Sequence, residues 1–461
     1  MTFRPQEIET FRITDFDFDP SDGRAVFRYA LDDVARFEEV IDFGRRAHLS
    51  ASEQRGFEAC LRLLHLTAGV SYYKAAAPPR LVVESGTLDA LEADFVNELY
   101  DRGLREFAYR NGLGVPLRFE LCAKFESGSR SENSSAPAPG LAVPVGGGKD
   151  SIVVAEALRE LRPLLVSVNG HPASRRIAEI AGLELAVIGR KVAPELLALN
   201  RSGALNGHVP VTAIVSLIVV ASGYLYGFST TAMSLEGSSS FPTRSIPQPP
   251  TSGVTSDSED SARSDRVPVE INHQWSKSIE FEQILQQLLT SSVHPGIRYV
   301  SLLRGFSDLE IADCFATLTQ YHRAFRSCNK AFAMSSDFDD WCCECPKCRF
   351  VFLTLATTTG REELISVFGS DLLSDADQVE GFVDLVHEDR KPFECVGTSD
   401  ESLAAIRRLV EDPNWSGSIV VQKLAQILST ELASVPRKDS AAPPGEVLTR
   451  IREELEAQQL V

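Results

Sequence analysis

The first clear pattern along the chain is an alternation of apolar and polar residues in FRITDFDFDPSDGRAVFRYAL, residues 11–31. A period of two predicts two half-buried strands, and the Pro-Ser-Asp-Gly stretch between them predicts a hairpin turn. Helical spacing of apolar residues follows, as in FEACLRLLHL at 57–66. We therefore expect an N-terminal α+β region over residues 1–135, which ends within the Ser/Pro/Gly-rich linker at 127–140.

From residue 141 to 360, short apolar runs alternate with helical patterns. The runs LAVPV, PLLVSVNG and LELAVIG predict buried strands separated by helices. Strands and helices in this order form right-handed βαβ units, so we expect an α/β domain with a parallel, doubly wound sheet. Residues 361–461 are expected to form a mostly helical C-terminal region. Its last helix starts after Pro443-Pro444 and has one face in solvent.

No charged residue occurs between Val209 and Leu235, a length that would suit a membrane span. The segment lacks flanking Lys or Arg anchors, and glycines interrupt it. We therefore prefer a buried helix that opens at Pro210 and ends near Gly223, followed by a buried strand in FSTTAMSL. The Ser- and Pro-rich residues 237–268 come next and are predicted to be a disordered insertion, because they offer little apolar surface to bury.

Composition narrows the class of protein. The 461 residues suffice for two or three domains, and a formal net charge of -18 argues against a nucleic-acid partner. Nine cysteines, four of them within residues 342–348, do not suit a disulfide-knit secreted protein. The N-terminus has no basic segment followed by an apolar one, so no signal peptide is predicted. We expect a cytoplasmic protein without a membrane partner.

The segment LAVPVGGGKDSIVVAEAL predicts a glycine-rich turn between a buried strand and a helix, a place that suits phosphate. A Walker loop would need Ser or Thr after the lysine, where Asp150 stands, and glycine where Val143 stands. A dinucleotide fingerprint would need a small residue at Ser151 and an acidic residue at Asn169, so it fits weakly. A glycine turn without a ligand remains the plain alternative.

Gly147, Gly148, Lys149, Asp150 and Ser151 satisfy Gly-Gly-x-Asp-Ser, which resembles the pyrophosphate loop of enzymes that split ATP into AMP and pyrophosphate. The resemblance implies that the two glycines cradle pyrophosphate, that the lysine and serine donate to it, and that the aspartate positions Mg²⁺. Gly146 stands where those enzymes usually have serine, which removes one donor. Adenine is expected at the end of the next strand, near Asn169.

A group of cysteines provides a second candidate site. Cys342, Cys345 and Cys348 are spaced C-x-x-C-x-x-C, and Cys328 lies upstream in RSCNKAF. Four thiolates suit a structural Zn²⁺ in the Cys-rich site 328–348, and reduced thiols without a metal remain the alternative. The order resembles the zinc site of the deazaguanine nitrile synthases, which also carry a pyrophosphate loop.

Five stretches together resemble the UDP-N-acetyl-α-D-muramoyl-L-alanyl-L-glutamate epimerases. They are GGGKDS, GHVPVTA, NHQWSKSIEFE, RSCNKAF and WCCECPKC, and they span about residues 141–360. The resemblance implies a reaction in peptidoglycan biosynthesis. ATP and Mg²⁺ would activate the terminal glutamate of UDP-MurNAc-L-Ala-L-Glu as an acyl-adenylate, and its L-Glu would be inverted to D-Glu.

Inversion needs acid–base groups, for which His208, His273 and Lys277 are the candidates. If residues 273–277 were helical, His273 and Lys277 would share a face. For each candidate a purely structural role remains equally open. Two other functions also stay open: another adenylating enzyme with a pyrophosphate loop, such as a nitrile synthase or an amide ligase, and a zinc protein that binds ATP without turning it over.

Overall fold

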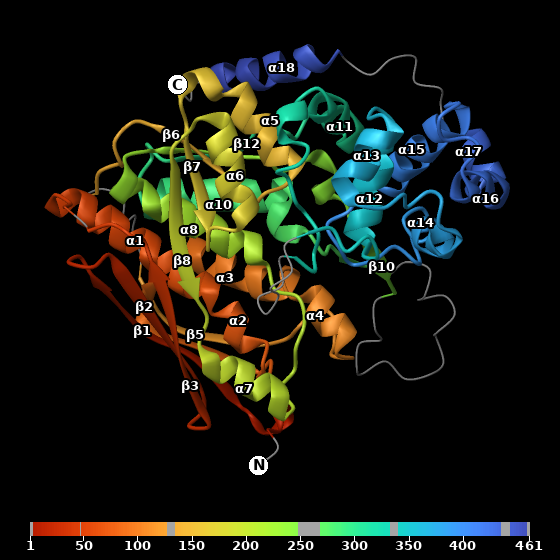
Figure 1. The fold of residues 1–461 in the computed structure, drawn as a ribbon. Helices are drawn as coiled ribbons and strands as arrows, with labels where there is room; N and C mark the ends of the chain where they lie inside the picture. Colours follow the sequence, from red (N-terminus) through yellow and green to blue (C-terminus); the bar gives the residue numbers. More distant parts are fainter. Residues whose placement is uncertain are drawn as a thin grey trace, which may run out of the picture. The chain divides into compact units, whose positions relative to one another are not determined.

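The computed structural model describes residues 3–46, 48–126, 134–247, 268–331, 340–434 and 443–458 (Figure 1). Contacts divide the chain into two compact units. The first comprises Met1–Ala138, Gly189–Gly227 and Pro242–Ile297, and the second comprises Pro139–Ile188, Phe228–Phe241 and Arg298–Val461. Each unit is thus assembled from separate segments of the chain, whereas the sequence analysis divides it into three consecutive regions.

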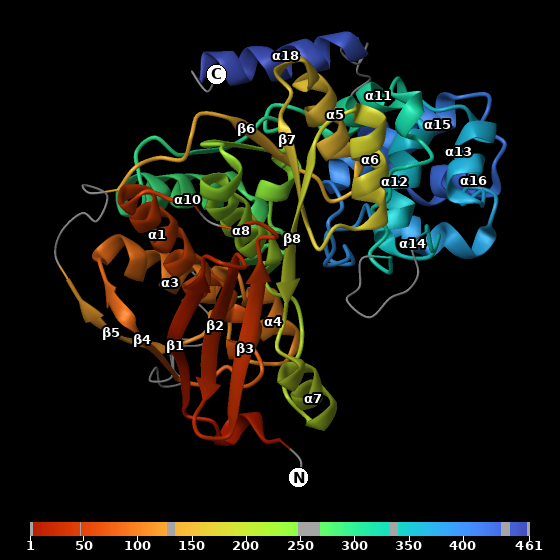
Figure 2. The same cartoon turned by 60° about the vertical axis from the view of Figure 1, so that its left-hand side comes forward.

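Five strands of the first unit are arranged side by side in the order β3-β2-β1-β4-β5 (Figure 2). They are β1 (Thr10–Asp19), β2 (Arg24–Leu31), β3 (Ala35–Asp42), β4 (Arg80–Leu88) and β5 (Glu120–Phe125). The first three pair antiparallel, whereas β4 and β5 join in parallel. The predicted hairpin is confirmed: Phe11 pairs with Leu31, and Gly23 in the turn has a φ of +75°.

Helices cover this sheet within the first unit. They are α1 (Ala51–Ala68), α2 (Val70–Tyr73), α3 (Ala90–Arg102), α4 (Arg105–Arg110), α7 (Pro194–Ser202), α8 (Val211–Tyr226) and α10 (Ile279–Ser292), with the short η1 (Pro5–Glu7) and η5 (Trp275–Lys277). Helices α1 and α3 contact the sheet, α8 packs on α1, and α10 packs on α3. Capping boxes at Ser50 and Asp89 fix the starts of α1 and α3.

Helix α8 is the long apolar segment of the sequence. It begins directly after Pro210, as predicted, and ends at Tyr226 rather than near Gly223. Gly227 ends it in the left-handed conformation, with a φ of +80°. Most of its apolar side chains are buried within the first unit, where the helix packs against α1 and η5, whereas Val211 in its first turn is exposed. Among the described residues, none of the helices has both the length and the apolar character needed to span a bilayer.

The second unit contains a parallel sheet in the order β12-β9-β6-β7-β8. Its strands are β6 (Leu141–Pro144), β7 (Leu164–Val168), β8 (Leu185–Lys191), β9 (Thr230–Met233) and β12 (Arg298–Ser301), and the part of β8 up to Ile188 belongs to this unit. The predicted alternation is confirmed, because α5 (Lys149–Ala157) joins β6 to β7 and α6 (Pro172–Ala181) joins β7 to β8. Strand β9 is the buried strand predicted in FSTTAMSL. The protein is therefore of mixed α/β class with a mostly parallel sheet.

The rest of the second unit is helical. Its helices are α11 (Asp308–Ala316), α12 (Pro346–Ala356), α13 (Arg361–Phe368), α14 (Val379–Val383), α15 (Ser399–Glu411), α16 (Ile419–Ile427), α17 (Ser429–Ser434) and α18 (Pro444–Ala457), with the short η3 (Arg159–Leu161), η4 (Gly237–Ser240), η6 (Thr319–Tyr321) and η7 (Ala376–Gln378). Helix α18 starts at the second proline of the predicted pair. It buries Val447, Ile451 and Leu455 along one face, as expected for a helix exposed on the other.

The insertion predicted at 237–268 lies only partly within the described residues. Here η4 is followed by strand β10 (Arg244–Ile246), which pairs antiparallel with β11 (Val269–Ile271). The prediction of disorder is therefore wrong for residues 237–247, because backbone hydrogen bonds fix a strand there although little apolar surface is buried. Residues 248–267 of the insertion and 127–133 of the predicted linker lie outside the described residues.

Candidate functional site

The glycine-rich turn follows the carboxyl end of β6 in the second unit. Gly147 has a φ of +117°, a backbone angle that residues with a side chain rarely adopt. Gly148 is the N-cap of α5. The backbone N–H of Arg326 donates to the carbonyl oxygen of Gly147 at 2.8 Å. A Cβ atom at Gly146 would meet nothing within 4 Å, so the space beside the turn is open. The first N–H groups of α5 have no earlier helical carbonyl to bond, which suits an anion.

Lys149 and Asp150 of this turn lie against a residue that the sequence analysis did not select. Lys149 Nζ donates to Asp150 Oδ1 at 2.5 Å and to Asp308 Oδ1, at the start of α11, at 3.0 Å. Lys149 and Asp308 are buried, with 2% and 3% of their surface exposed. Burial alone would lower the pKa of Lys149, but the charges of Asp150 and Asp308 raise it above its ordinary value. The lysine is therefore a fixed cation between two carboxylates.

Asp308 is held from two further sides. Ser238 Oγ donates to Asp308 Oδ2 at 3.0 Å, and the Asp308 backbone N–H donates to Glu401 Oε1 at 2.8 Å. Burial alone would raise the pKa of Asp308, but Lys149 lowers it below its ordinary value. Burial and the charge of Asp308 raise the pKa of Glu401. We call Lys149, Asp150, Ser238, Asp308 and Glu401 the turn cluster.

Ser151 and Asn169, the other residues expected near ATP, lie at the same edge of the sheet. Ser151 Oγ donates to the carbonyl oxygen of Gly148 at 3.1 Å. Asn169 follows β7 directly, has a φ of +62°, and donates its backbone N–H to Ile188 at 2.8 Å. Because β6 and β7 are parallel neighbours, their carboxyl ends meet where such sheets bind ligands. The glycine turn and Asn169 thus follow the carboxyl ends of two neighbouring parallel strands.

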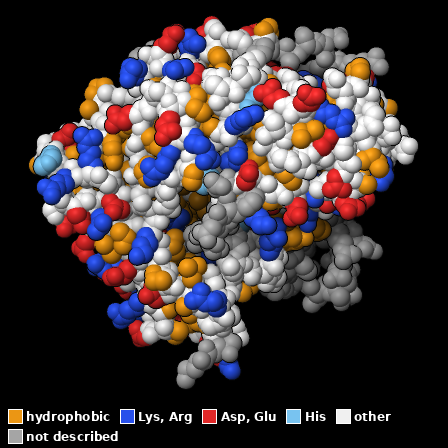
Figure 3. Space-filling view, in the orientation of Figure 1, with side chains coloured by type: hydrophobic (Ala, Val, Ile, Leu, Met, Phe, Trp, Pro, Cys, Tyr) orange, Lys and Arg blue, Asp and Glu red, His pale blue; other side chains and the backbone are white. Residues whose placement is uncertain are grey.

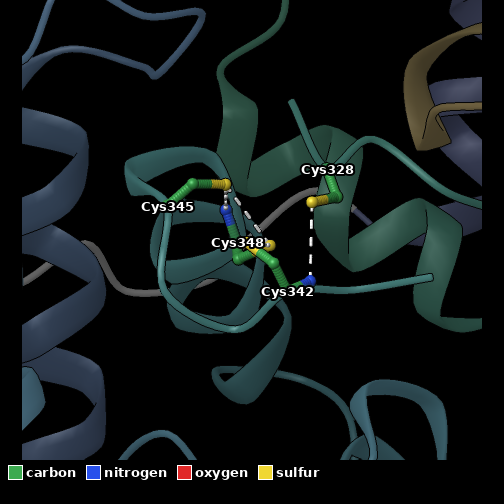
Figure 4. A group of neighbouring side chains, drawn as sticks. All are labelled: Cys328, Cys342, Cys345 and Cys348. Carbon is green, nitrogen blue, oxygen red and sulfur yellow. Dashed lines mark hydrogen bonds between the residues drawn. The ribbon is translucent and has the colours of Figure 1, made fainter. Parts of the chain in front are cut away.

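The four predicted thiol ligands also come together in the second unit. Figure 4 shows Cys342, Cys345 and Cys348 pointing toward one another with Cys328 facing them. The sulfur atoms of all four lie within 4.8 Å of one another, with Cys345 Sγ 3.5 Å from Cys348 Sγ. Cys343 is turned away, and its thiol donates to the Phe368 carbonyl oxygen at 3.3 Å. Four converging sulfurs fit the soft, tetrahedral donor set that Zn²⁺ prefers.

The cysteine group adjoins the glycine turn. Arg326 and Ser327 precede Cys328 directly; Arg326 donates to the turn carbonyl, and Ser327 Cβ lies 3.6 Å from the position of a Cβ built on Gly148. On the other side, Cys345 is the N-cap of α12 and its sulfur accepts from the Cys348 N–H at 3.4 Å. A metal ion bound by these thiols would therefore fix the Arg326 to Cys328 segment, which supports the turn.

Two of the three acid–base candidates lie side by side in the first unit. The ring centroids of His208 and His273 are 4.2 Å apart, with an angle of 39° between the planes. His273 Nδ1 hydrogen-bonds to Glu106 Oε2 of α4, and Glu106 Oε1 accepts from Arg110 Nε at 2.7 Å. We call Glu106, His208 and His273 the histidine cluster. His273 lies in a turn before η5, so it does not share an α-helix with Lys277.

The surroundings of the histidine cluster set its charge. Burial, and next the charge of His273, lower the pKa of His208 to about 3, and Lys277 and Lys74 act in the same direction. The His208 ring is therefore neutral at neutral pH. Burial alone would raise the pKa of Glu106, but the hydrogen bond from His273 and the nearby positive charges lower it below its ordinary value.

Lys74 fixes the loop that leads to His208. Its Nζ donates to Asn206 Oδ1 at 2.6 Å and to the carbonyl oxygen of Gly207 at 3.0 Å. Burial lowers the pKa of Lys74 to about 8. The loop position of His208 is thus determined by a buried ammonium group rather than by regular secondary structure.

Comparison with known proteins places the chain in a family. The model of the MurL N-terminal domain matches residues 2–248 and 251–302, and the model of the MurL C-terminal domain matches residues 324–439. The chain belongs to the MurL family. The turn cluster, the cysteine group and the histidine cluster lie within the matched residues, except that Asp308 falls between the two MurL matches.

Three curated proteins similar to this MurL-family chain share one name, UDP-N-acetyl-alpha-D-muramoyl-L-alanyl-L-glutamate epimerase. The protein of Xanthomonas oryzae pv. oryzae is 38% identical over 93% of this chain and 92% of its own length. That of a Micromonospora species is 39% identical over 95% of each chain, and that of Salinispora tropica is 41% identical over 91% and 89%. No solved structure matches the chain.

Sequence reasoning missed Asp308, Glu401, Glu106 and Lys74. Asp308 and Glu401 lie in FSDLE and TSDESL, where a serine or threonine followed three residues later by glutamate indicates only a capping box. Glu106 lies in a short helix without any motif. These residues acquire a role through tertiary contacts with segments that are distant along the chain.

Proposed function

We propose that the chain is an ATP-dependent epimerase that converts the terminal L-Glu of UDP-MurNAc-L-Ala-L-Glu to D-Glu in peptidoglycan precursor biosynthesis. The name shared by relatives 38% to 41% identical over most of the chain supports the substrate and the inversion. The glycine turn with its turn cluster, at the carboxyl edge of a parallel sheet, carries the proposal that ATP is consumed. We assign the reaction to the cytoplasm, where ATP is available.

ATP would solve a definite chemical problem. A carboxylate resists loss of its α-proton, because the carbanion would place two negative charges next to each other. In the proposed reaction a carboxylate oxygen of the terminal glutamate attacks the α-phosphorus of ATP, and pyrophosphate leaves. The acyl-adenylate then loses its α-proton to a base and regains a proton on the opposite face. Water finally hydrolyses the mixed anhydride to AMP and the D-Glu carboxylate.

The second unit would hold the nucleotide. We infer a doubly wound sheet of the type that carries a pyrophosphate loop, with the backbone N–H groups from Gly147 to Ser151 facing the phosphates. Lys149 is buried between two carboxylates, so it would act on the phosphates mainly through its charge. Asp150 is 23% exposed at the side chain and offers a hard oxygen ligand to Mg²⁺. Bound Mg²⁺ would neutralise phosphate charge.

Proton transfer is assigned to the first unit. His208, His273 and Lys277 are the proposed acid–base groups, and Glu106 orients His273. On the face shown in Figure 3, acidic and basic side chains are intermixed, which supports a small-molecule substrate over nucleic acid.

We further propose a structural Zn²⁺ held by Cys328, Cys342, Cys345 and Cys348. The support is the convergence of four sulfurs within 4.8 Å, which uncoordinated thiols do not require. A closed shell of four thiolates leaves no position for substrate, so the ion would stabilise the segment beside the glycine turn and take no part in the chemistry.

The test is to incubate the protein with ATP, Mg²⁺ and UDP-MurNAc-L-Ala-L-Glu and to quantify D-Glu after acid hydrolysis, together with AMP and pyrophosphate. Wild-type protein is expected to form one AMP per D-Glu. Asp150→Asn is expected to lower AMP formation by about 100-fold or more, because it removes the proposed metal ligand. Asp389→Asn, on the surface of the same unit, serves as the matched control.

Each of the other possible results would indicate a different function for this protein. Pyrophosphate without D-Glu would indicate another adenylating enzyme, such as an amide ligase or a nitrile synthase. ATP binding without pyrophosphate would indicate a nucleotide-binding zinc protein. D-Glu without AMP would refute the acyl-adenylate and leave the epimerase.

A further inference from the structure

Inverting a carbon centre requires that one proton leaves one face and another arrives on the opposite face. When two fixed groups do this, each stands about 3 to 3.5 Å from the carbon, so their reactive atoms are roughly 6 to 7 Å apart across it. Two imidazoles used in this way would have ring centroids farther apart still, because each ring extends away from the carbon.

The observed pair does not meet this requirement. The ring centroids of His208 and His273 are 4.2 Å apart, and a nitrogen of each ring lies within 4.8 Å of the other and of a Glu106 oxygen. The rings are in direct contact, so no substrate carbon fits between them. Both histidines therefore have to approach a substrate from the same side.

Glu106 determines which nitrogen of His273 is available. An ionised carboxylate only accepts hydrogen bonds, so His273 Nδ1 carries a hydrogen and donates it to Glu106 Oε2. Nδ1 is therefore engaged by the carboxylate, which leaves Nε2 as the nitrogen assigned to proton transfer in this proposal. Arg110 donates to the second carboxylate oxygen at 2.7 Å, and Glu106 itself is 4% exposed. This arrangement fixes the ring orientation in the way that buried carboxylates orient catalytic imidazoles.

His208 completes the group as a neutral ring. Among the described residues, none forms a hydrogen bond with either of its ring nitrogens, and its contact is with the His273 ring. Lys74 holds the backbone just before it, so the contact is built into the loop. Two touching imidazoles above one buried carboxylate can share one added proton, but two positive charges there would repel each other.

We propose that Glu106, His273 and His208 form a single proton-transfer unit that serves one face of the substrate α-carbon, with Glu106 as its positioning residue. This inference rests on the proposed epimerase function. The unit accepts the α-proton as the carbon–hydrogen bond breaks, and the electron pair passes into the enolate. A different acid delivers the second proton, and the unit returns its own proton to water.

A metal ion is the competing use of these three side chains, since two histidines and one carboxylate are a common ligand set. The positive charges around the histidine cluster oppose the binding of a metal cation. Lys74 and Lys277 both act on His208 electrostatically, and Glu106 already accepts hydrogen bonds from Arg110 and His273. A divalent cation would have to displace these bonds and tolerate two nearby ammonium groups.

The test runs the reaction in D₂O and measures two products: deuterium at the glutamate α-carbon, and D-Glu. Both His208→Asn and His273→Asn are expected to lose the two products together, by about 100-fold or more. The double variant is expected to be no slower than the slower single variant, because residues of one unit are not additive. The control is His48→Asn, which changes an exposed histidine of the first structural unit that is not one of the three proton-transfer residues. This variant should retain both products.

Opposite-face bases would give another pattern. A single histidine variant that still incorporates deuterium but forms no D-Glu would overturn the proposal, as would normal activity in either variant. A metal ion that stays bound after Cys345→Ser and is lost with His208→Asn would also overturn it. If wild-type protein neither exchanges the α-proton nor forms D-Glu, the proposed function itself fails.

The positioning role of Glu106 has its own readout. Glu106→Gln keeps the shape but removes the charge that favours a protonated histidine pair. The acid limb of the rate profile is expected to move to lower pH by about one unit, and Glu106→Asp should restore part of it. Glu58→Gln, on an exposed face of α1, is the control. An unchanged acid limb in Glu106→Gln would contradict the assignment.

Discussion

The turn cluster and the histidine cluster are both buried groups of ionisable side chains, yet they balance charge differently. In the turn cluster a fully buried lysine lies between two carboxylates, and the opposite charges hold Lys149 protonated and Asp308 ionised. In the histidine cluster a neutral His208 touches His273, which bonds to Glu106. The first group keeps its charges over a wide pH range, whereas the second can gain and lose a proton.

This difference assigns nucleotide binding and proton transfer to different residues of the same chain. A group whose charges are fixed provides a stable field and geometry beside a phosphate site. A group with an uncharged imidazole provides a proton acceptor. Substitutions in the two clusters should therefore fail in different ways: the first through stability and nucleotide binding, the second through proton exchange.

The largest effect is expected from breaking the charge balance of the turn cluster. Asp308→Asn leaves Lys149 as a buried cation with one partner fewer, and removing one member of a buried pair costs about 3 to 5 kcal/mol. The thermal unfolding temperature should fall by several degrees. Lys149→Met combined with Asp308→Asn should recover part of the loss. Glu380→Gln, which breaks an exposed ion pair with Arg390, should shift the temperature little.

An intermediate effect is expected at the cysteines that adjoin the turn. Cys345→Ser should reduce bound zinc from one equivalent to a fraction, measured by elemental analysis, and should weaken ATP binding because the Arg326 to Cys328 segment loses its anchor. Cys343→Ser is the matched control, since its thiol faces Phe368. Wild-type protein without zinc, or equal ATP affinity in both variants, would contradict the structural role.

A third effect, spread over several pH units, concerns acid stability. The pKa of His208 is lowered from 6.5 to about 3, so as pH falls the unfolded chain binds a proton before the folded one does. The contribution is therefore intact above about pH 6.5 and is lost as pH falls toward 3, by at most about 1.4 kcal/mol per pH unit. His208→Asn should unfold with a weaker dependence on pH between 6.5 and 4 than wild-type protein. An equal dependence would contradict the neutral buried ring.

Much of the fold could be predicted from the sequence, because residue patterns within short segments indicate where its helices, strands and turns lie. Alternation predicted the hairpin of β1 and β2, and Pro210 marked the start of α8. The strand at Arg244–Ile246 was missed, since its partner Val269–Ile271 lies beyond a long polar stretch and its side chains are only half-buried. Polar composition indicates missing core material, but it does not exclude backbone pairing.

The sites were accessible only in part. Residues inside motifs, such as Asp150 and the four cysteines, can be selected by spacing, and the structure brings each set together. Asp308 and Glu106 could not be selected, because their partners lie 159 and 167 residues away along the chain. The contact between His208 and His273 likewise follows from a loop held by Lys74, which no local pattern encodes.

The central claim is that the turn cluster serves nucleotide binding and the histidine cluster serves proton transfer. Its most direct test is a pair of rates measured on His273→Asn. One is isotope exchange between pyrophosphate and ATP in the presence of UDP-MurNAc-L-Ala-L-Glu, and the other is deuterium incorporation at the glutamate α-carbon. The account predicts that pyrophosphate exchange stays within about tenfold of wild type while deuterium incorporation falls by about 100-fold or more. Loss of both rates together, or deuterium incorporation at the wild-type rate, would contradict it.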